Sequence, residues 1–129
     1  MIKFLLTGQL PSGKNQQQLA MVRGRIMKFP NKRFKEWRAA ATQQLIMQAP
    51  LPFRTFTKPL EIRVNYWAGD LIKRDATGLL DALFHLFELA PTELSPVVKD
   101  DCLFHGVVWT YCGLDRANPR AEIEITEVA

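Results

Sequence analysis

The sequence is poor in cysteine and histidine, with two residues of each among 129. Two cysteines cannot make the disulfide framework of a small secreted domain. On one extended strand, Cys102 and Cys112 would share a face but lie roughly 33 Å apart, so we expect two reduced, half-buried thiols. The same spacing disfavours a zinc site built from Cys102, Cys112, His85 and His105.

Long hydrophobic runs are also missing. The run at residues 84–89 is interrupted by His85 and Glu88, so we expect no segment that spans a membrane. The amino-terminal apolar run is too short for a secretion signal, and we therefore expect a cytoplasmic protein. With 47% hydrophobic and 23% charged residues, the composition is that of a globular protein, and the length predicts one domain over residues 1–129.

Acidic residues are scarce in the first 38 positions, where Glu36 stands among nine basic residues. This segment carries a net charge of +8, whereas residues 39–129, with eight basic and twelve acidic residues, carry −4. A basic half joined to an acidic half is typical of a polyanion-binding surface next to a carboxylate cluster. A solvated basic helix and hairpin without a partner would give the same pattern.

Hydrophobic periodicity predicts the order of the elements. Alternating apolar positions predict strands over residues 2–7, 60–67, 102–111 and 120–128, and two short strands within residues 20–29. Helical spacing predicts one helix over residues 32–48, capped by Asn31, and another over residues 78–90, capped by Thr77. The order β-ββ-α-β-α-β-β indicates an α+β domain with two helices packed on a mixed or antiparallel sheet.

The loop after the first strand has part of a phosphate-binding pattern. Residues 8–15, GQLPSGKN, match the Walker A spacing up to the last position, where Asn15 replaces the hydroxyl residue that holds Mg²⁺. No βαβ pattern and no second strand ending in an acid accompany the loop. A turn with Lys14 exposed is the simpler interpretation, and nucleotide binding is an alternative.

Carboxylates gather around the second predicted helix. Asp70, Asp75 and Asp81 surround its start, and the pair Asp100–Asp101 opens the next strand. One polar stripe runs along this otherwise apolar helix and consists of Thr77, Asp81, His85 and Glu88.

An acid on a helix that is largely buried requires a partner. That partner is either a cation from Arg63, Lys73 or Arg74, or a hard divalent metal ion. The adjacent Asp100 and Asp101 favour the metal ion, because crowded like charges need a cation. A solvated turn at this acidic pair is the alternative.

These residues resemble the RusA-type Holliday-junction resolvases. The central stretch KRDATGLLDAL at residues 73–83, followed by Lys99-Asp100-Asp101, carries the resemblance. Residues 8–15 look like the family's amino-terminal Pro-Ser-x-Asn loop, and residues 118–125 are similar to the closing strand of phage-type members. The resemblance covers nearly the whole chain in order and implies a RusA-like fold.

The resemblance implies a Mg²⁺-dependent endonuclease, with Mn²⁺ as a substitute, that acts in DNA recombination and repair as a homodimer on four-way junctions. Asp75 and Asp101 match the first and last acids of the pattern Asp-x-Asp-Asn-x-x-Lys followed by Asp-Asp. Thr77 stands at the second acid and Asp81 at the lysine, so we expect Asp81 to be the replacement ligand. Asp100 would orient a metal-bound water, with Thr77 and His85 supporting the ligands.

The same resemblance gives the basic residues a role. Lys73 and Arg74 would hold the scissile or a flanking phosphate. Contacts to the DNA backbone that are independent of sequence would come from Lys14, Arg23, Arg25, Lys32, Lys35 and Arg38.

Two other classes of protein fit these residues. One is a catalytically impaired module that binds branched DNA, because the second acid and the lysine of the pattern are missing. The other is a small structural or partner-binding protein in which the basic face serves only solubility. Metal-dependent nicking and salt-dependent junction binding separate these classes.

Overall fold

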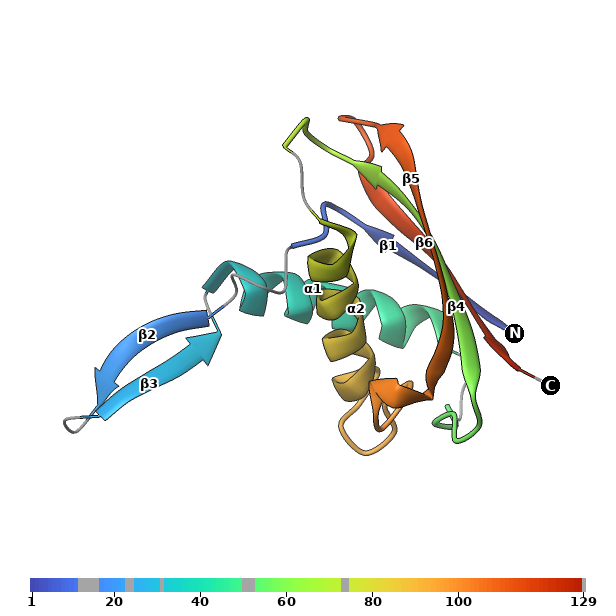
Figure 1. The fold of residues 1–129 in the computed structure, drawn as a ribbon, viewed down its shortest axis with the longest axis horizontal. Coiled ribbons are helices and arrows are strands. Elements are labelled where there is room, and N and C mark those ends of the chain that lie inside the picture. Colours follow the sequence, from blue (N-terminus) through green and yellow to red (C-terminus); the bar gives the residue numbers. More distant parts are fainter. Residues whose placement is uncertain (12–16, 23–24, 31, 50–52, 73–74, 129) are drawn as a thin grey trace.

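The computed structural model describes residues 1–11, 17–22, 25–30, 32–49, 53–72 and 75–128, with only the backbone described at residues 17–22 and 25–30. Four strands form one mixed sheet in the order β1 (Ile2–Thr7), β6 (Arg120–Glu127), β4 (Leu60–Ala68) and β5 (Phe104–Leu114). β6 is antiparallel to both β1 and β4, whereas β5 runs parallel to β4. Helices α1 (Lys32–Gln48) and α2 (Ala76–Leu89) lie on one side of this sheet (Figure 1).

The predicted α+β class, with two helices on a mixed sheet, is confirmed at this level. The short strands β2 (Gln17–Val22) and β3 (Arg25–Pro30) pair with each other as a separate antiparallel ribbon, which stands away from the sheet (Figure 1). None of the described helices is long and apolar enough to cross a membrane.

The alternation of β4 explains how the core is built. Leu60, Ile62, Val64 and Tyr66 are buried on the side that faces the helices, while the residues between them are exposed or half-buried. From α2, Phe87 stacks on Phe4 of β1 at 6.3 Å between ring centroids. Burying each large apolar side chain contributes about 1.5–3 kcal/mol, so these contacts fix α2 against the sheet.

Two predicted boundaries are wrong around the acidic residues. Helix α2 begins at Ala76, and its N-cap is Asp75 rather than Thr77, because the Asp75 carboxylate accepts the N–H of Gly78. β5 begins at Phe104 instead of Cys102, because Asp101–Leu103 forms a short 3₁₀ turn, η2, that Asp100 caps. Asp75 and Thr77, two residues with good capping side chains, stand two positions apart at the start of α2, and Asp75 is the cap.

The polar stripe of α2 lies on its exposed side. Thr77, Asp81 and His85 are exposed and Glu88 is half-buried, whereas the buried positions are all apolar or glycine. The expected buried carboxylate is therefore absent from this helix. Asp81 and Glu88 therefore need no cation to offset the cost of a fully buried charge. A metal ion would bind them only if other ligands lie close by.

The described residues on either side of the loop after β1 do not support a Walker A site. The described element that follows it is the strand β2, whereas a phosphate loop opens a helix whose N-terminus holds the phosphate. The N–H groups of Gly8 and Leu10 already donate to the Pro119 carbonyl (2.8 Å) and the Tyr66 hydroxyl (3.2 Å). Lys14 and Asn15 lie outside the described residues.

Candidate metal centre

Three carboxylates come together where α2 ends and β5 begins. The ligand atoms of Glu88, Asp100 and Asp101 all lie within 4.8 Å of one another. Glu88 is half-buried, and the two aspartates are exposed. We refer to these three residues as the carboxylate cluster.

The return of the chain along α2 builds this cluster. The N–H of Val97 donates to the Ala90 carbonyl at 2.7 Å, and that of Val98 to the Phe87 carbonyl at 3.1 Å. These bonds bring the segment before β5 back to the last turn of α2. The N–H of Asp101 then donates to Glu88 Oε1 at 3.1 Å.

Hydrogen bonds around η2 favour the charged form of Asp100. The N–H of Cys102 donates to Asp100 Oδ1 at 2.9 Å and lowers the pKa of that carboxyl from its usual value. In the opposite direction, the hydrogen bond with Asp100, assisted by some desolvation and by the nearby negative charges of Asp100 and Asp101, raises the pKa of the Cys102 thiol. Asp100 is therefore anionic at neutral pH beside a protonated thiol.

The structure does not bring Asp75 and Asp101 together within one chain. Asp75 caps the start of α2, 13 positions before Glu88, which corresponds to about 20 Å along the helix axis. Asp81 lies on the exposed stripe seven positions before Glu88, or about 10 Å along the axis. One ion cannot contact Asp75 and the carboxylate cluster of the same copy.

Glu88 was missed as a ligand in the sequence interpretation. It belongs to the predicted polar stripe, and that stripe points to the cluster. The missing information was the path of residues 90–100, which brings Asp100 and Asp101 to the Glu88 end of α2.

His85 connects the stripe to the basic helix α1. Its Nε2 lies 3.2 Å from Arg38 Nη1, and its ring lies 5.7 Å from that of Phe34. Because His85 precedes Glu88 by three residues on α2, the Arg38 guanidinium lies one turn from the cluster. Thr77 is exposed near the other end of the stripe, in the first turn of α2.

The predicted DNA-binding residues are only partly described. Lys32 and Lys35 are exposed on α1, where Lys32 lies 3.8 Å from Glu36, one turn further along, and Arg38 is half-buried. Arg25 is the first residue of β3. The remaining four predicted residues lie outside the described part of the chain: Lys14, Arg23, Lys73 and Arg74.

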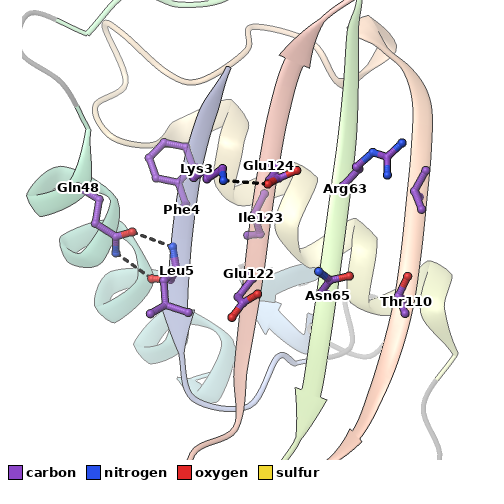
Figure 2. Close-up of a pocket in the computed structure, with 11 residues that line it drawn as sticks. Lys3, Phe4, Leu5, Gln48, Arg63, Asn65, Thr110, Glu122, Ile123 and Glu124 are labelled. Atoms are coloured by element: carbon purple, nitrogen blue, oxygen red, sulfur yellow. Dashed lines mark hydrogen bonds and ion pairs between the residues drawn. The ribbon is translucent and has the colours of Figure 1, made fainter.

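A hollow in the described structure lies away from the cluster. It measures about 470 Å³ and opens on the side of the sheet away from the helices, where its lining carries Lys3, Arg63, Glu122 and Glu124 (Figure 2). Lys3 pairs with Glu124 at 3.2 Å, and Arg63 pairs with Glu61 at 2.9 Å. Because its charges balance, this hollow favours neither a polyanion nor a cation, and the carboxylate cluster is the better candidate for chemistry.

Both cysteines are free and exposed, so the expectation of reduced thiols holds and that of half-burial is wrong. Among the described residues, the carboxylate cluster is the one group of three His, Cys, Asp or Glu side chains close enough to share an ion. It contains neither sulfur nor nitrogen ligands, which does not suit a structural zinc site.

The fold and this site define a small α+β domain with an exposed carboxylate cluster beside a basic helix. No protein-family model matches the sequence, and a search of curated proteins finds no match.

Proposed function

We propose that this chain is a Mg²⁺-dependent, structure-selective endodeoxyribonuclease that resolves four-way DNA junctions by paired phosphodiester hydrolysis. The observation that carries the proposal is the convergence of Glu88, Asp100 and Asp101 within 4.8 Å. The sequence resemblance to RusA-type resolvases supplies the reaction and the substrate, together with the proposal of a RusA-like fold and a homodimer.

The donor set of the cluster fits a hard divalent cation. Mg²⁺ takes oxygen ligands in an octahedron and keeps several waters, and it commonly binds through only one or two carboxylates. The cluster offers oxygen ligands alone, and the exposure of both aspartates leaves room for water. When bound there, Mg²⁺ supplies a water of lowered pKa and neutralises charge that develops on the phosphate.

The residues of the cluster have separate tasks in this proposal. The hydrogen bond between Asp101 N–H and Glu88 Oε1 holds the two residues together, and a carboxylate oxygen of each lies within 4.8 Å of one of the other. Asp100 is anionic and fixed by the N–H of Cys102, and it orients the attacking water. Holding these groups before the substrate arrives lowers the entropy cost of the reaction.

The basic helix α1 supplies the surface that binds DNA. Arg33 and Lys35 are exposed, and Arg38 reaches the stripe beside His85. Contacts from such residues to backbone phosphates position a duplex without reading its sequence. An arm of the junction bound across α1 would bring its backbone toward the cluster.

A second candidate function is that of a branched-DNA-binding module without nuclease activity. The observation that favours it is the placement of Asp75, which caps α2 about 20 Å from the cluster and so has a structural role of its own. Such a module would bind junctions with the same salt dependence and leave them intact.

The decisive experiment incubates the purified protein with a synthetic four-way junction and with a linear duplex, each in Mg²⁺ or EDTA. We expect symmetric paired nicks in the junction with Mg²⁺ alone. Binding without cutting would favour the second candidate, and equal cutting of the duplex would exclude selectivity for structure.

A further inference from the structure

The two lateral edges of the main sheet are treated differently. On β1, the side-chain amide of Gln48 accepts the N–H of Leu5 at 2.7 Å and donates to its carbonyl at 2.8 Å (Figure 2). One turn earlier on α1, Gln44 Oε1 accepts the N–H of Thr7 at 2.7 Å. Helix α1 therefore satisfies outward backbone groups of Leu5 and Thr7 and blocks the addition of another strand at this part of the edge.

The β5 edge has no such cover among the described residues. β5 is the last strand of the sheet and pairs only with β4, so its other side presents a row of N–H and C=O groups (Figure 1). The pairing with β4 is irregular near both ends and regular over residues 106–111. This regular stretch has the geometry to accept another strand.

The composition of β5 lacks the usual protection of an open edge. Its eleven residues include no Lys, Arg, Asp or Glu, and His105 is its one titratable group other than Tyr111 and Cys112. Edge strands that stay unpaired commonly carry charges, especially lysine, that oppose pairing. β5 has neither these charges nor a covering helix in the described structure.

Apolar side chains are exposed along both faces of this edge. Val107, Val108, Tyr111 and Leu114 are 40–56% exposed. Ile72, before the start of α2, is 65% exposed and shares a small hollow of about 110 Å³ with Trp109 and Tyr111. Apolar side chains exposed beside an open strand edge favour an interaction surface at this edge.

We propose that β5 pairs antiparallel with β5 of a second copy of this chain, across a two-fold axis. A strand without charge does not attract phosphate, and its best complement is another neutral strand with apolar side chains, which is β5 itself. In an antiparallel pair related by a two-fold axis, residues before the centre of one β5 lie opposite residues after the centre of the other. Because β5 has no Lys, Arg, Asp or Glu, no like charges lie opposite each other across the pair. Pairing over residues 106–111 would add about six backbone hydrogen bonds and bury apolar side chains on both faces.

The resulting dimer has one sheet of eight strands, four from each copy. The two-fold axis of an antiparallel pair is perpendicular to the sheet, so the helices of both copies lie on the same face. The carboxylate clusters, each next to the start of a β5 strand, then open on one side at opposite ends of the paired strands. Two clusters related by this symmetry would make two symmetric cuts in one junction. This last step rests on the proposed nuclease function.

The test measures mass in solution by sedimentation without DNA, so it is independent of nuclease activity. Val108→Lys places a charge on each copy at the shared edge, and we expect the dimer dissociation constant to rise at least about 100-fold. Leu5→Lys is the matched control, because Leu5 and Val108 are 42% and 41% exposed and line the same hollow. We expect Leu5→Lys to remain a dimer, because its edge is closed by Gln48.

Amide hydrogen exchange on the unmodified protein supplies a second readout that no misfolded variant can obscure. We expect protection of residues 106–111 to increase with protein concentration while the amides of β1 do not change. A wild-type protein that is monomeric at every concentration would overturn the proposal. So would a stable dimer in folded Val108→Lys, or equal dissociation by Leu5→Lys, which would indicate face-to-face packing instead. A dimer that cuts no junction would refute the nuclease and leave the β5 interface standing.

Discussion

The backbone N–H of Asp101 donates to Glu88 Oε1 at 3.1 Å and ties the segment before β5 to the last turn of α2. This bond joins two residues that are 13 positions apart and completes a cluster whose third member, Asp100, caps the η2 turn. The same groups that end a helix and start a strand therefore form the candidate metal site. A substitution that keeps this hydrogen bond but removes a carboxylate charge therefore tests the site and leaves the fold intact.

Glu88→Gln should weaken metal binding without unfolding the protein. The amide keeps an oxygen that can accept the Asp101 N–H but loses the charge that attracts a divalent cation. Titration with Mn²⁺ followed by paramagnetic resonance should show at least a tenfold loss of affinity, and the thermal midpoint should stay within a few degrees. Glu122→Gln, on the far side of the sheet, is the control and should bind the ion as the wild type does.

Asp75 gives a prediction that separates a capping role from a catalytic role. Asparagine caps a helix as well as aspartate, whereas alanine does not, so Asp75→Ala should lose about 1 kcal/mol of stability and Asp75→Asn almost none. Both variants should cut junctions at close to the wild-type rate once folded. Loss of cutting in a stable Asp75→Asn variant would show that Asp75 belongs to the metal site, as the resemblance implies.

Asp81 tests the replacement of the missing family acid. It is exposed and about 10 Å along α2 from Glu88, so Asp81→Asn should keep the thermal midpoint and change nicking by only a few-fold. A melting scan and a nicking assay on the same preparation check this. A loss of several orders of magnitude would show that Asp81 binds the ion, either beside the cluster or from a second copy.

The basic helix should control affinity for every DNA sequence alike. Reversing Arg33 and Lys35 to glutamate should lower the slope of log affinity against log salt by about 0.9 for each phosphate that the variant no longer neutralises. Lys58→Glu, exposed in the segment before β4, serves as the control. An unchanged slope in the double variant would mean that α1 is a solvated surface and that DNA binds elsewhere.

Cys102 reports on the charge of Asp100. Because Asp100 raises the pKa of the Cys102 thiol, less thiolate is present at a given pH, and the thiolate is the species that reacts with alkylating agents. In EDTA, Asp100→Asn should lower that pKa and speed alkylation of Cys102 near pH 8. The measurement uses a Cys112→Ser background, so that mass spectrometry follows a single thiol. Equal rates would mean that the two groups do not interact in solution.

Local patterns predicted the elements better than the site. The helix over residues 32–48 has the bounds expected from its apolar spacing, because that signal lies within one element. The cap of α2 was assigned to Thr77 although Asp75 performs it, since both residue types cap helices and only the backbone conformation selects one.

Features that depend on contacts between distant segments were not readable from the sequence. The placement of Glu88 beside Asp101 depends on the bond between Val98 and Phe87. The open edge at β5 follows from the strand order β1-β6-β4-β5, which no alternation of residues encodes. Asp100 and Asp101 were identified as candidate ligands from the sequence, because two adjacent acidic residues are a local signal, whereas Glu88 was not.

The most direct test of the central claim is the initial rate of Mg²⁺-dependent nicking of a synthetic four-way junction by the wild type and by Glu88→Gln. We expect paired, symmetric nicks by the wild type, and a rate at least about 100-fold lower for the variant with DNA binding unchanged or stronger. Equal rates for the two proteins, or no Mg²⁺-dependent nicking by a folded wild type, would contradict it.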